Sequence, residues 1–186
     1  VKQILKMQFS ALSPSQIEDI PLQMVNPVRR KYYTSILVAD DFRGSIRGFA
    51  IYMHMSDLKF LYLDFLSTAP GKPTSGVGGS LYERVREEAA SLRTTGIFYE
   101  CLPDDPDLCR DKTLLDQNAK RLAFYERYGA YPIINTRYET PVKEGADCPP
   151  YLVYDDLGSG VPLGAAALRK IYRAILTRKY SGFCPP

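Results

Sequence analysis

The sequence predicts an α/β protein in which antiparallel strands come first and strand–helix units follow. Its 186 residues, 45% apolar and 24% charged, suffice for one folded domain with a hydrophobic core. Segments 32–39, 45–55 and 59–67 are rich in Tyr, Ile, Val, Phe and Met and are separated by short polar breaks. From residue 59 onward, a strand, a loop and a helix occur twice in succession.

The amino-terminal part predicts one short helix among strands. We expect a first strand at residues 2–9, with bulky side chains at positions 5, 7 and 9. A helix should begin at Ser13, because serine is a good N-cap and Pro14 suits the first turn. Pro21 and Pro27 should keep that helix short. Residues 40–44 have the composition of a hairpin connection between the next two strands.

The central and carboxy-terminal parts alternate between helices and strands. Apolar residues at positions 81, 85, 89 and 92 predict a helix over 78–92, and those at 115, 119, 122 and 125 predict a second helix that stops at Gly129. Strands are expected at 96–102, 131–140 and 151–154. Residues 163–180 form an amphipathic pattern. We therefore expect one domain over residues 1–156 and a helical extension over 157–186.

Charge and cysteine content exclude several classes of protein. A net charge of +3 is too small by itself to bind nucleic acid, and no apolar run approaches the ~18 residues of a membrane span. We expect neither nucleic acid nor membrane as a partner. The four cysteines form no Cys-x-x-Cys pair and His54 stands alone, so no metal site is expected. We interpret the cysteines as free thiols of a cytoplasmic protein, with one or two disulfide bridges as the alternative. The opening Val1 and closing Pro186 are compatible with a fragment of a longer polypeptide.

The most informative segment is the glycine-rich start of the helix at 78–92. The first turn of a helix leaves backbone N–H groups without partners, and glycine at 76, 78 and 79 lets an anion approach them. A pyrophosphate fits such a site. A Walker loop is disfavoured because Val77 occupies the lysine position, and a dinucleotide fingerprint is disfavoured because Leu81 replaces its third glycine.

A second segment extends this pattern. Residues 118–129 end a helix on an aromatic face and a glycine stop. Together, residues 76–81 and 118–129 resemble the two signature segments of the GNAT acetyltransferase family, and the resemblance covers roughly residues 2–156. It implies a mixed, mostly antiparallel sheet of about seven strands flanked by helices, and acetyl-CoA as cosubstrate. The chain departs from the family at Pro73, where Gln or Arg is usual.

The resemblance also assigns roles to residues. It implies that Tyr125 is the general acid that protonates the departing thiolate, and that the acetyl-CoA contacts come from these positions: Leu66, Ser67, Thr68, Ser75, Gly76, Val77, Gly78, Gly79, Ser80 and Asn118. For the general base we consider Glu100 first, then Asp64 and His54, with a water chain as a further possibility.

The acceptor is expected to be an amine. Asp104, Asp105 and Asp107 follow the strand that carries Glu100 and would attract a cation. We expect a small cationic amine, such as a polyamine or amino-acid derivative, or an amine of a protein. A solubilising acidic turn is the alternative for these aspartates. The alternative function is a non-catalytic module that binds acyl-CoA or a partner chain. A homodimer is also possible.

Overall fold

The computed structural model describes residues 2–8, 13–69, 76–136, 138 and 148–180. The chain divides into two compact units, of which the first contains residues 1–94 and 162–186 and the second residues 95–161. The described residues contain six strands, against about seven expected. Within each unit, the recorded strand pairings are antiparallel.

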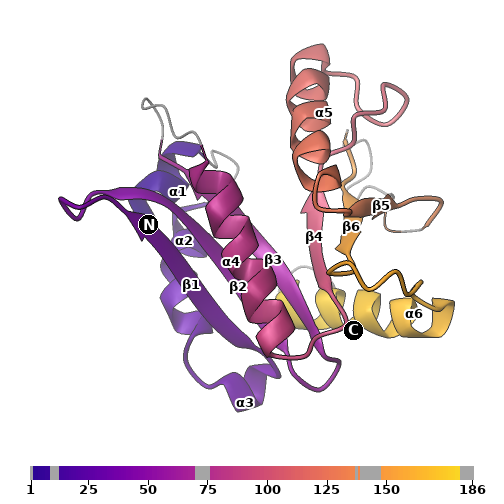
Figure 1. Ribbon diagram of the computed structural model, residues 1–186, viewed down its shortest axis with the longest axis horizontal. Coiled ribbons are helices and arrows are strands. Elements are labelled where there is room, and N and C mark those ends of the chain that lie inside the picture. Colours follow the sequence, from indigo (N-terminus) through magenta and orange to yellow (C-terminus); the bar gives the residue numbers. More distant parts are fainter. Residues whose placement is uncertain (1, 9–12, 70–75, 137, 139–147, 181–186) are drawn as a thin grey trace. The chain divides into compact units, whose positions relative to one another are not determined.

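The first unit is built on a three-stranded meander (Figure 1). Its strands are β1 (Tyr33–Asp40), β2 (Ile46–Met55) and β3 (Phe60–Thr68). β1 pairs with β2 and β2 with β3. The predicted hairpin is confirmed, and Asp41 fixes its turn by accepting hydrogen bonds from the N–H groups of Arg43 and Ser45, each at 2.9 Å.

Helices cover both faces of this meander. α2 (Pro14–Gln23) begins as predicted, because Ser13 caps it and forms a reciprocal capping box with Gln16. Pro21 is accommodated near its carboxy-terminal end. α4 (Val77–Ser91) lies on the opposite face of the meander (Figure 1). Most of its apolar side chains are buried. The buried α4 side chains include those of Leu81, Val85 and Ala89.

The strand expected at residues 2–9 is wrong. Lys2–Gln8 forms a helix, α1, and α1 packs with α2 on β2. Leu5 is fully buried there with Ile17, and Lys2 Nζ donates to Glu18 Oε2 at 2.6 Å. The segment contains lysine, glutamine, leucine and methionine, which all favour helices. Packing of Leu5 against α2 also requires a single buried position, and these two effects outweigh the alternation of bulky residues at positions 5, 7 and 9.

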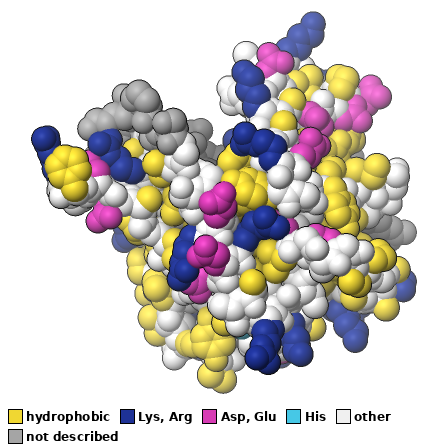
Figure 2. Space-filling model, in the orientation of Figure 1, with side chains coloured by type: hydrophobic (Ala, Val, Ile, Leu, Met, Phe, Trp, Pro, Cys, Tyr) yellow, Lys and Arg dark blue, Asp and Glu magenta, His cyan; other side chains and the backbone are white. Residues whose placement is uncertain are grey.

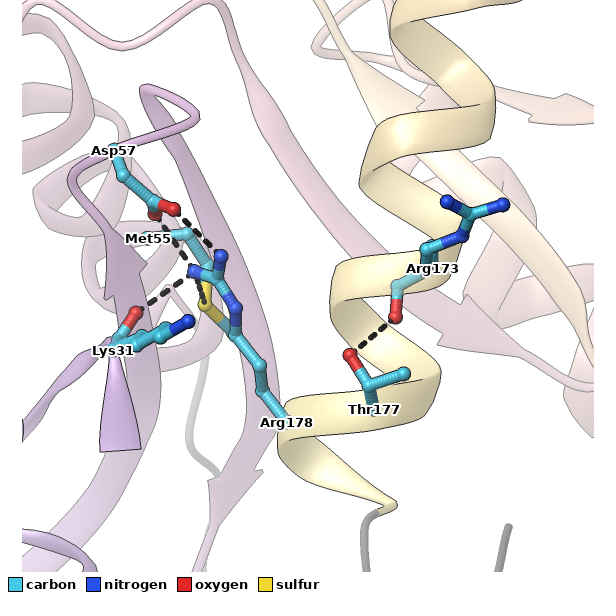
Figure 3. A network of polar contacts seen from close by, with 6 residues as sticks. All are labelled: Lys31, Met55, Asp57, Arg173, Thr177 and Arg178. Carbon is cyan, nitrogen blue, oxygen red and sulfur yellow. Dashed lines mark hydrogen bonds and ion pairs between the residues drawn. The ribbon is translucent and has the colours of Figure 1, made fainter. Parts of the chain in front are cut away.

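The carboxy-terminal helix belongs to the first unit. α6 (Ala165–Ala174) continues into a π-helical turn, η2 (Ile175–Lys179). Figure 3 shows how Arg178 of this turn reaches the loop between β2 and β3. Its guanidinium donates to both carboxylate oxygens of Asp57, at 2.7 and 2.6 Å, and to the carbonyl of Lys31 at 2.9 Å. Such a bidentate pair fixes the orientation of the helix end.

The second unit contains three strands and one long helix. β4 (Ile97–Cys101) pairs with β6 (Tyr151–Asp155), which pairs with β5 (Tyr131–Ile133). β5 is shorter than the strand expected at 131–140. α5 (Lys112–Glu126) ends before Gly129, as predicted, and that glycine has a left-handed φ of 84°.

The expectation of free thiols is wrong for two cysteines. Cys109 and Cys148 form a disulfide, because the fold brings their Cα atoms to 4.3 Å although 39 residues separate them in the sequence. Cys101 is a buried free thiol. Because two of the cysteines are bonded, cysteine content no longer supports the prediction of a reducing compartment. None of the described helices combines the length and the apolar character needed to cross a bilayer.

Candidate functional site

The strand that leads to the glycine-rich helix contains a β-bulge. β3 pairs with β2 so that Phe65 lies opposite Ile51 and Leu63 lies opposite Tyr52. Asp64 is therefore the extra residue on β3. A bulge bends the strand and redirects its side chains, and bulges are common beside active sites. The bulge lies directly before Leu66, Ser67 and Thr68, the segment for which we expect contacts with the coenzyme arm.

The amino terminus of α4 has the features of an anion site. Gly76 adopts a left-handed φ of 91°, which a residue with a side chain rarely adopts. In the described part of the chain, no side chain caps this helix and no acidic residue occupies its first turn. The first intrahelical bond runs from Ser80 N–H to the carbonyl of Gly76. The amides that precede it retain the partial positive charge of the helix end.

Close packing brings this helix start to the end of β3. A Cβ atom at Gly48 of β2 would lie 2.8 Å from the carbonyl oxygen of Ser67 and 3.1 Å from Cγ1 of Val77. At Gly78, a Cβ atom would be 3.7 Å from Cγ2 of Thr68. Residues 66–68 and 76–80 therefore lie side by side in the first unit. Ser75 and Pro73 lie outside the described residues.

Nothing in the described structure covers the exposed side of the glycine turn. A Cβ atom at Gly76 would meet no other atom within 4 Å, and at Gly78 it would meet Thr68 alone. Gly79 is half-buried and Ser80 is exposed. Uncapped helix starts of this kind, with backbone amides open to one side, are common sites of phosphate binding in proteins.

Asp64, a candidate general base, is held in an ion pair. Its carboxylate accepts a hydrogen bond from Nζ of Lys179 in η2, and Lys179 also donates to the Tyr62 hydroxyl at 3.1 Å. The Asp64 side chain is 7% exposed and that of Lys179 is 16% exposed. The pair joins the bulge of β3 to the end of the carboxy-terminal helix.

Tyr125, the candidate general acid, lies on the buried face of α5 in the second unit. Its ring centroid is 4.4 Å from that of Tyr99 on β4 and 4.9 Å from that of Phe124. Burial raises the pKa of the Tyr125 phenol, and the neighbouring Cys101 raises it further. Burial also raises the pKa of the Cys101 thiol, to about 12. Burial thus keeps the phenol protonated and makes it a weaker acid than an exposed tyrosine.

Glu100 and Asn118 have partners within the second unit. The Tyr138 hydroxyl donates a hydrogen bond to Glu100. Because strand side chains alternate, Glu100 points to the face of β4 opposite to Tyr99, against which Tyr125 packs. Asn118 is 1% exposed and its Nδ2 donates to the carbonyl of Pro103 at 2.8 Å, which fixes the loop after β4 to α5.

In the acidic loop after β4, one of the three aspartates holds the loop conformation. The Asp105 side chain accepts a hydrogen bond from the N–H of Asp107 at 2.8 Å, and its carbonyl accepts from Leu108 and Cys109. Asp105 therefore stabilises a turn. Asp104 and Asp107 are exposed.

Sequence reasoning missed three partners of the candidate residues. Lys179 binds Asp64 across 115 residues, Tyr138 binds Glu100 across 38, and Pro103 binds Asn118 across 15. Side-chain contacts between residues so far apart leave no periodic signal in one sequence. His54, the remaining base candidate, is half-buried on β2, and burial lowers its pKa.

Comparison with solved structures identifies the fold. A GNAT-family protein from Bacteroides thetaiotaomicron is 21% identical to this chain over 96% of it and 89% of that chain, with a TM-score of 0.65. The aminoglycoside 6′-N-acetyltransferase from Enterococcus faecium is 17% identical over 88% and 90% of the two chains, with a TM-score of 0.60. An aminoglycoside 6′-N-acetyltransferase solved with coenzyme A is 16% identical over the same shares, with a TM-score of 0.61.

These likenesses establish the architecture. The chain has the fold of the GNAT acetyltransferases, as the resemblance of its two motifs implies. No family model matches the sequence, and no curated relative does either.

Proposed function

We propose that this protein is an N-acetyltransferase that moves an acetyl group from acetyl-CoA to a primary amine by direct attack. The observation that carries the proposal is the uncapped, glycine-rich start of α4 beside the end of β3, in a chain with the GNAT fold. The backbone of residues 75–80 would hold the diphosphate of the coenzyme. Leu66, Ser67 and Thr68 would contact its pantetheine arm, and Asn118 would lie along that arm.

The chemistry requires two proton transfers. An amine nitrogen attacks the carbonyl carbon of the thioester, and the carbon–sulfur bond then breaks. Tyr125 would donate its phenolic proton to the departing sulfur, and the match of its position to the family's second motif supports this role. The amine loses its proton to a base, for which Glu100 is the first candidate, before Asp64, His54 or a water chain.

The acceptor is proposed to be a cationic amine. Asp104 and Asp107 supply exposed negative charge, whereas Asp105 is engaged in its turn. Two proteins of the same fold are named as aminoglycoside acetyltransferases, so an aminoglycoside belongs among the test substrates. A screen of polyamines, amino-acid amides, aminoglycosides and lysine peptides, followed by thiol release, tests this class. A cytoplasmic location stays a prediction, which subcellular fractionation tests.

A second candidate function is a module that binds acyl-CoA without turnover. The observation that favours it is that both carboxylate candidates for the base are engaged, Asp64 by Lys179 and Glu100 by Tyr138. Binding of acetyl-CoA with no thiol release from any amine would select this function.

The first experiment tests the coenzyme site by calorimetry. Gly78→Val places a branched side chain in the first turn of α4 and should weaken CoA binding about tenfold, because phosphate approach to the amides is blocked. Ala90→Val, at an exposed position of the same helix, should bind CoA like the parent protein. Equal affinities of both variants, with folding verified by melting temperature, would contradict this site.

The second experiment tests the general acid. Tyr125→Phe removes the proton donor and keeps the ring, so kcat should fall on the order of 100-fold while the affinity for acetyl-CoA changes little. Tyr128→Phe, in the turn after the same helix, serves as the control and should retain kcat. Full activity of Tyr125→Phe would exclude the acid role.

A further inference from the structure

A large groove lies within the first unit, between the α2–α3 segment and the carboxy-terminal helix. α3 spans Pro27–Arg30. The groove has a volume of about 1230 Å³, above the roughly 300–1,000 Å³ usual for small-molecule pockets. Leu58, in the turn between β2 and β3, belongs to its lining. Since Gly48 and Thr68 pair at the other end of the meander, the groove is remote from the start of α4.

The lining of the groove is strongly basic. Among the described residues that line it, none carries a carboxylate. Arg178 is neutralised by its bidentate pair with Asp57. Six further basic side chains line the groove: Arg29, Arg30, Lys31, Arg169, Lys170 and Arg173. Figure 2 shows several Lys and Arg side chains along the lower edge of the view.

These charges are available to a ligand. Arg29, Arg169, Lys170 and Arg173 are exposed, and no carboxylate in the described part of the chain pairs with them. In Figure 3, the Arg178 guanidinium lies against Asp57, whereas the Arg173 guanidinium projects from another side of the helix. Several like charges in one concave surface repel one another, so an anionic occupant would relieve that repulsion.

The groove also contains apolar surface. Leu22 is 57% exposed and Val25 is 54% exposed, although both line it. Leu58 and Ala166 contribute further apolar atoms. A ligand that fits this lining combines negative charge with aliphatic groups.

Among anionic macromolecules, an acidic peptide fits this combination best. A bilayer surface cannot enter a concave groove. Single-stranded nucleic acid binds through aromatic side chains on which its bases stack, and the described aromatic residue in the lining, Tyr32, is 3% exposed. A peptide brings carboxylates for the basic rim and aliphatic side chains for Leu22 and Val25.

We propose that this groove binds an acidic peptide segment of a partner protein, in which leucine-like side chains contact Leu22 and Val25 and carboxylates pair with the basic residues of α3 and α6. This interaction does not depend on acetyl transfer.

Fluorescence anisotropy with a labelled peptide of glutamates and interspersed leucines tests the proposal. The peptide should bind the full chain, and added salt should weaken it. The double variant Arg169→Gln/Arg173→Gln should weaken binding about fivefold. The matched variant Lys112→Gln/Lys120→Gln removes two exposed charges from α5 of the other unit and should leave binding unchanged.

A third variant tests the apolar contribution. Leu22→Ser should weaken binding of the leucine-containing peptide and should leave binding of an all-glutamate peptide unchanged. The proposal is overturned if both double variants weaken binding equally, if Leu22→Ser acts equally on both peptides, or if no peptide binds. Tighter binding of a single-stranded RNA or of phosphatidylserine vesicles would likewise overturn it. Because the readout is peptide binding, its failure leaves acetyl-CoA binding and turnover unaffected.

Discussion

Lys179 and Asp64 form an ion pair in which both side chains are largely buried. Lys179 also lies over the Tyr62 ring, with Nζ 4.4 Å from its centroid. Removal of one member of such a pair leaves an uncompensated charge, which costs more than the pair contributes. The pair explains why an aspartate is stable at this position of β3.

Lys179→Met should therefore destabilise the fold. We expect the free energy of unfolding in urea to fall by about 3 kcal/mol, because the buried Asp64 carboxyl group loses its partner. The double variant Lys179→Met/Asp64→Leu should recover most of that loss. A single variant as stable as the parent would show that the carboxylate finds another cation or water.

At the scale of secondary-structure elements, the contact between α4 and the meander depends on a residue that has no side chain. A Cβ atom at Gly48 would approach the Ser67 carbonyl to 2.8 Å and Cδ1 of Leu81 to 2.9 Å. The Ser67 oxygen is part of the backbone and cannot move away independently. Gly48 therefore permits the close approach that places residues 76–80 beside residues 66–68.

Gly48→Ala should push α4 away from β2 and β3. We expect a loss of about 1–3 kcal/mol in the free energy of unfolding, and weaker CoA binding at temperatures where the variant is folded. Gly78→Ala is the matched control for stability, since its Cβ would make an ordinary contact of 3.7 Å. An unchanged melting temperature of Gly48→Ala would mean that α4 shifts to accommodate the methyl group without loss of stability.

The same scale shows where sequence reasoning succeeds. α4 and α5 carry long apolar stripes that identify a helix independently of neighbours, and both lie where predicted. α1 has seven residues, too few for its period to be distinguished from that of a strand, and its type is decided by α2. The strand predicted at 131–140 is too long, since β5 ends at Ile133.

At the scale of the whole molecule, the chain contains two compact units, and the disulfide lies within the second. A cross-link stabilises a fold mainly by reducing the entropy of the unfolded chain, and closure of a loop of 39 residues contributes up to about 4 kcal/mol. The stabilisation belongs to the unit that contains β4, α5 and β6.

Cys109→Ala/Cys148→Ala should therefore weaken the second unit selectively. Hydrogen exchange should become faster in β4 and β6, while β1–β3 retain most of their protection. A reducing agent should reproduce this pattern in the parent protein and have no effect on the variant. Equal acceleration in both units would show that they unfold as one.

The sequence alone determined the elements whose signals are local. The glycine-rich helix start, the capped helix at Ser13, the hairpin and the position of Tyr125 on a helix follow from residue type and short-range period, since backbone conformation and burial stripes depend on nearby residues. Tertiary structure decided the partners of the charged and sulfur groups: Asp64 with Lys179, Glu100 with Tyr138 and Cys109 with Cys148. These pairs join residues 38 to 115 positions apart, and chain folding alone brings them within reach.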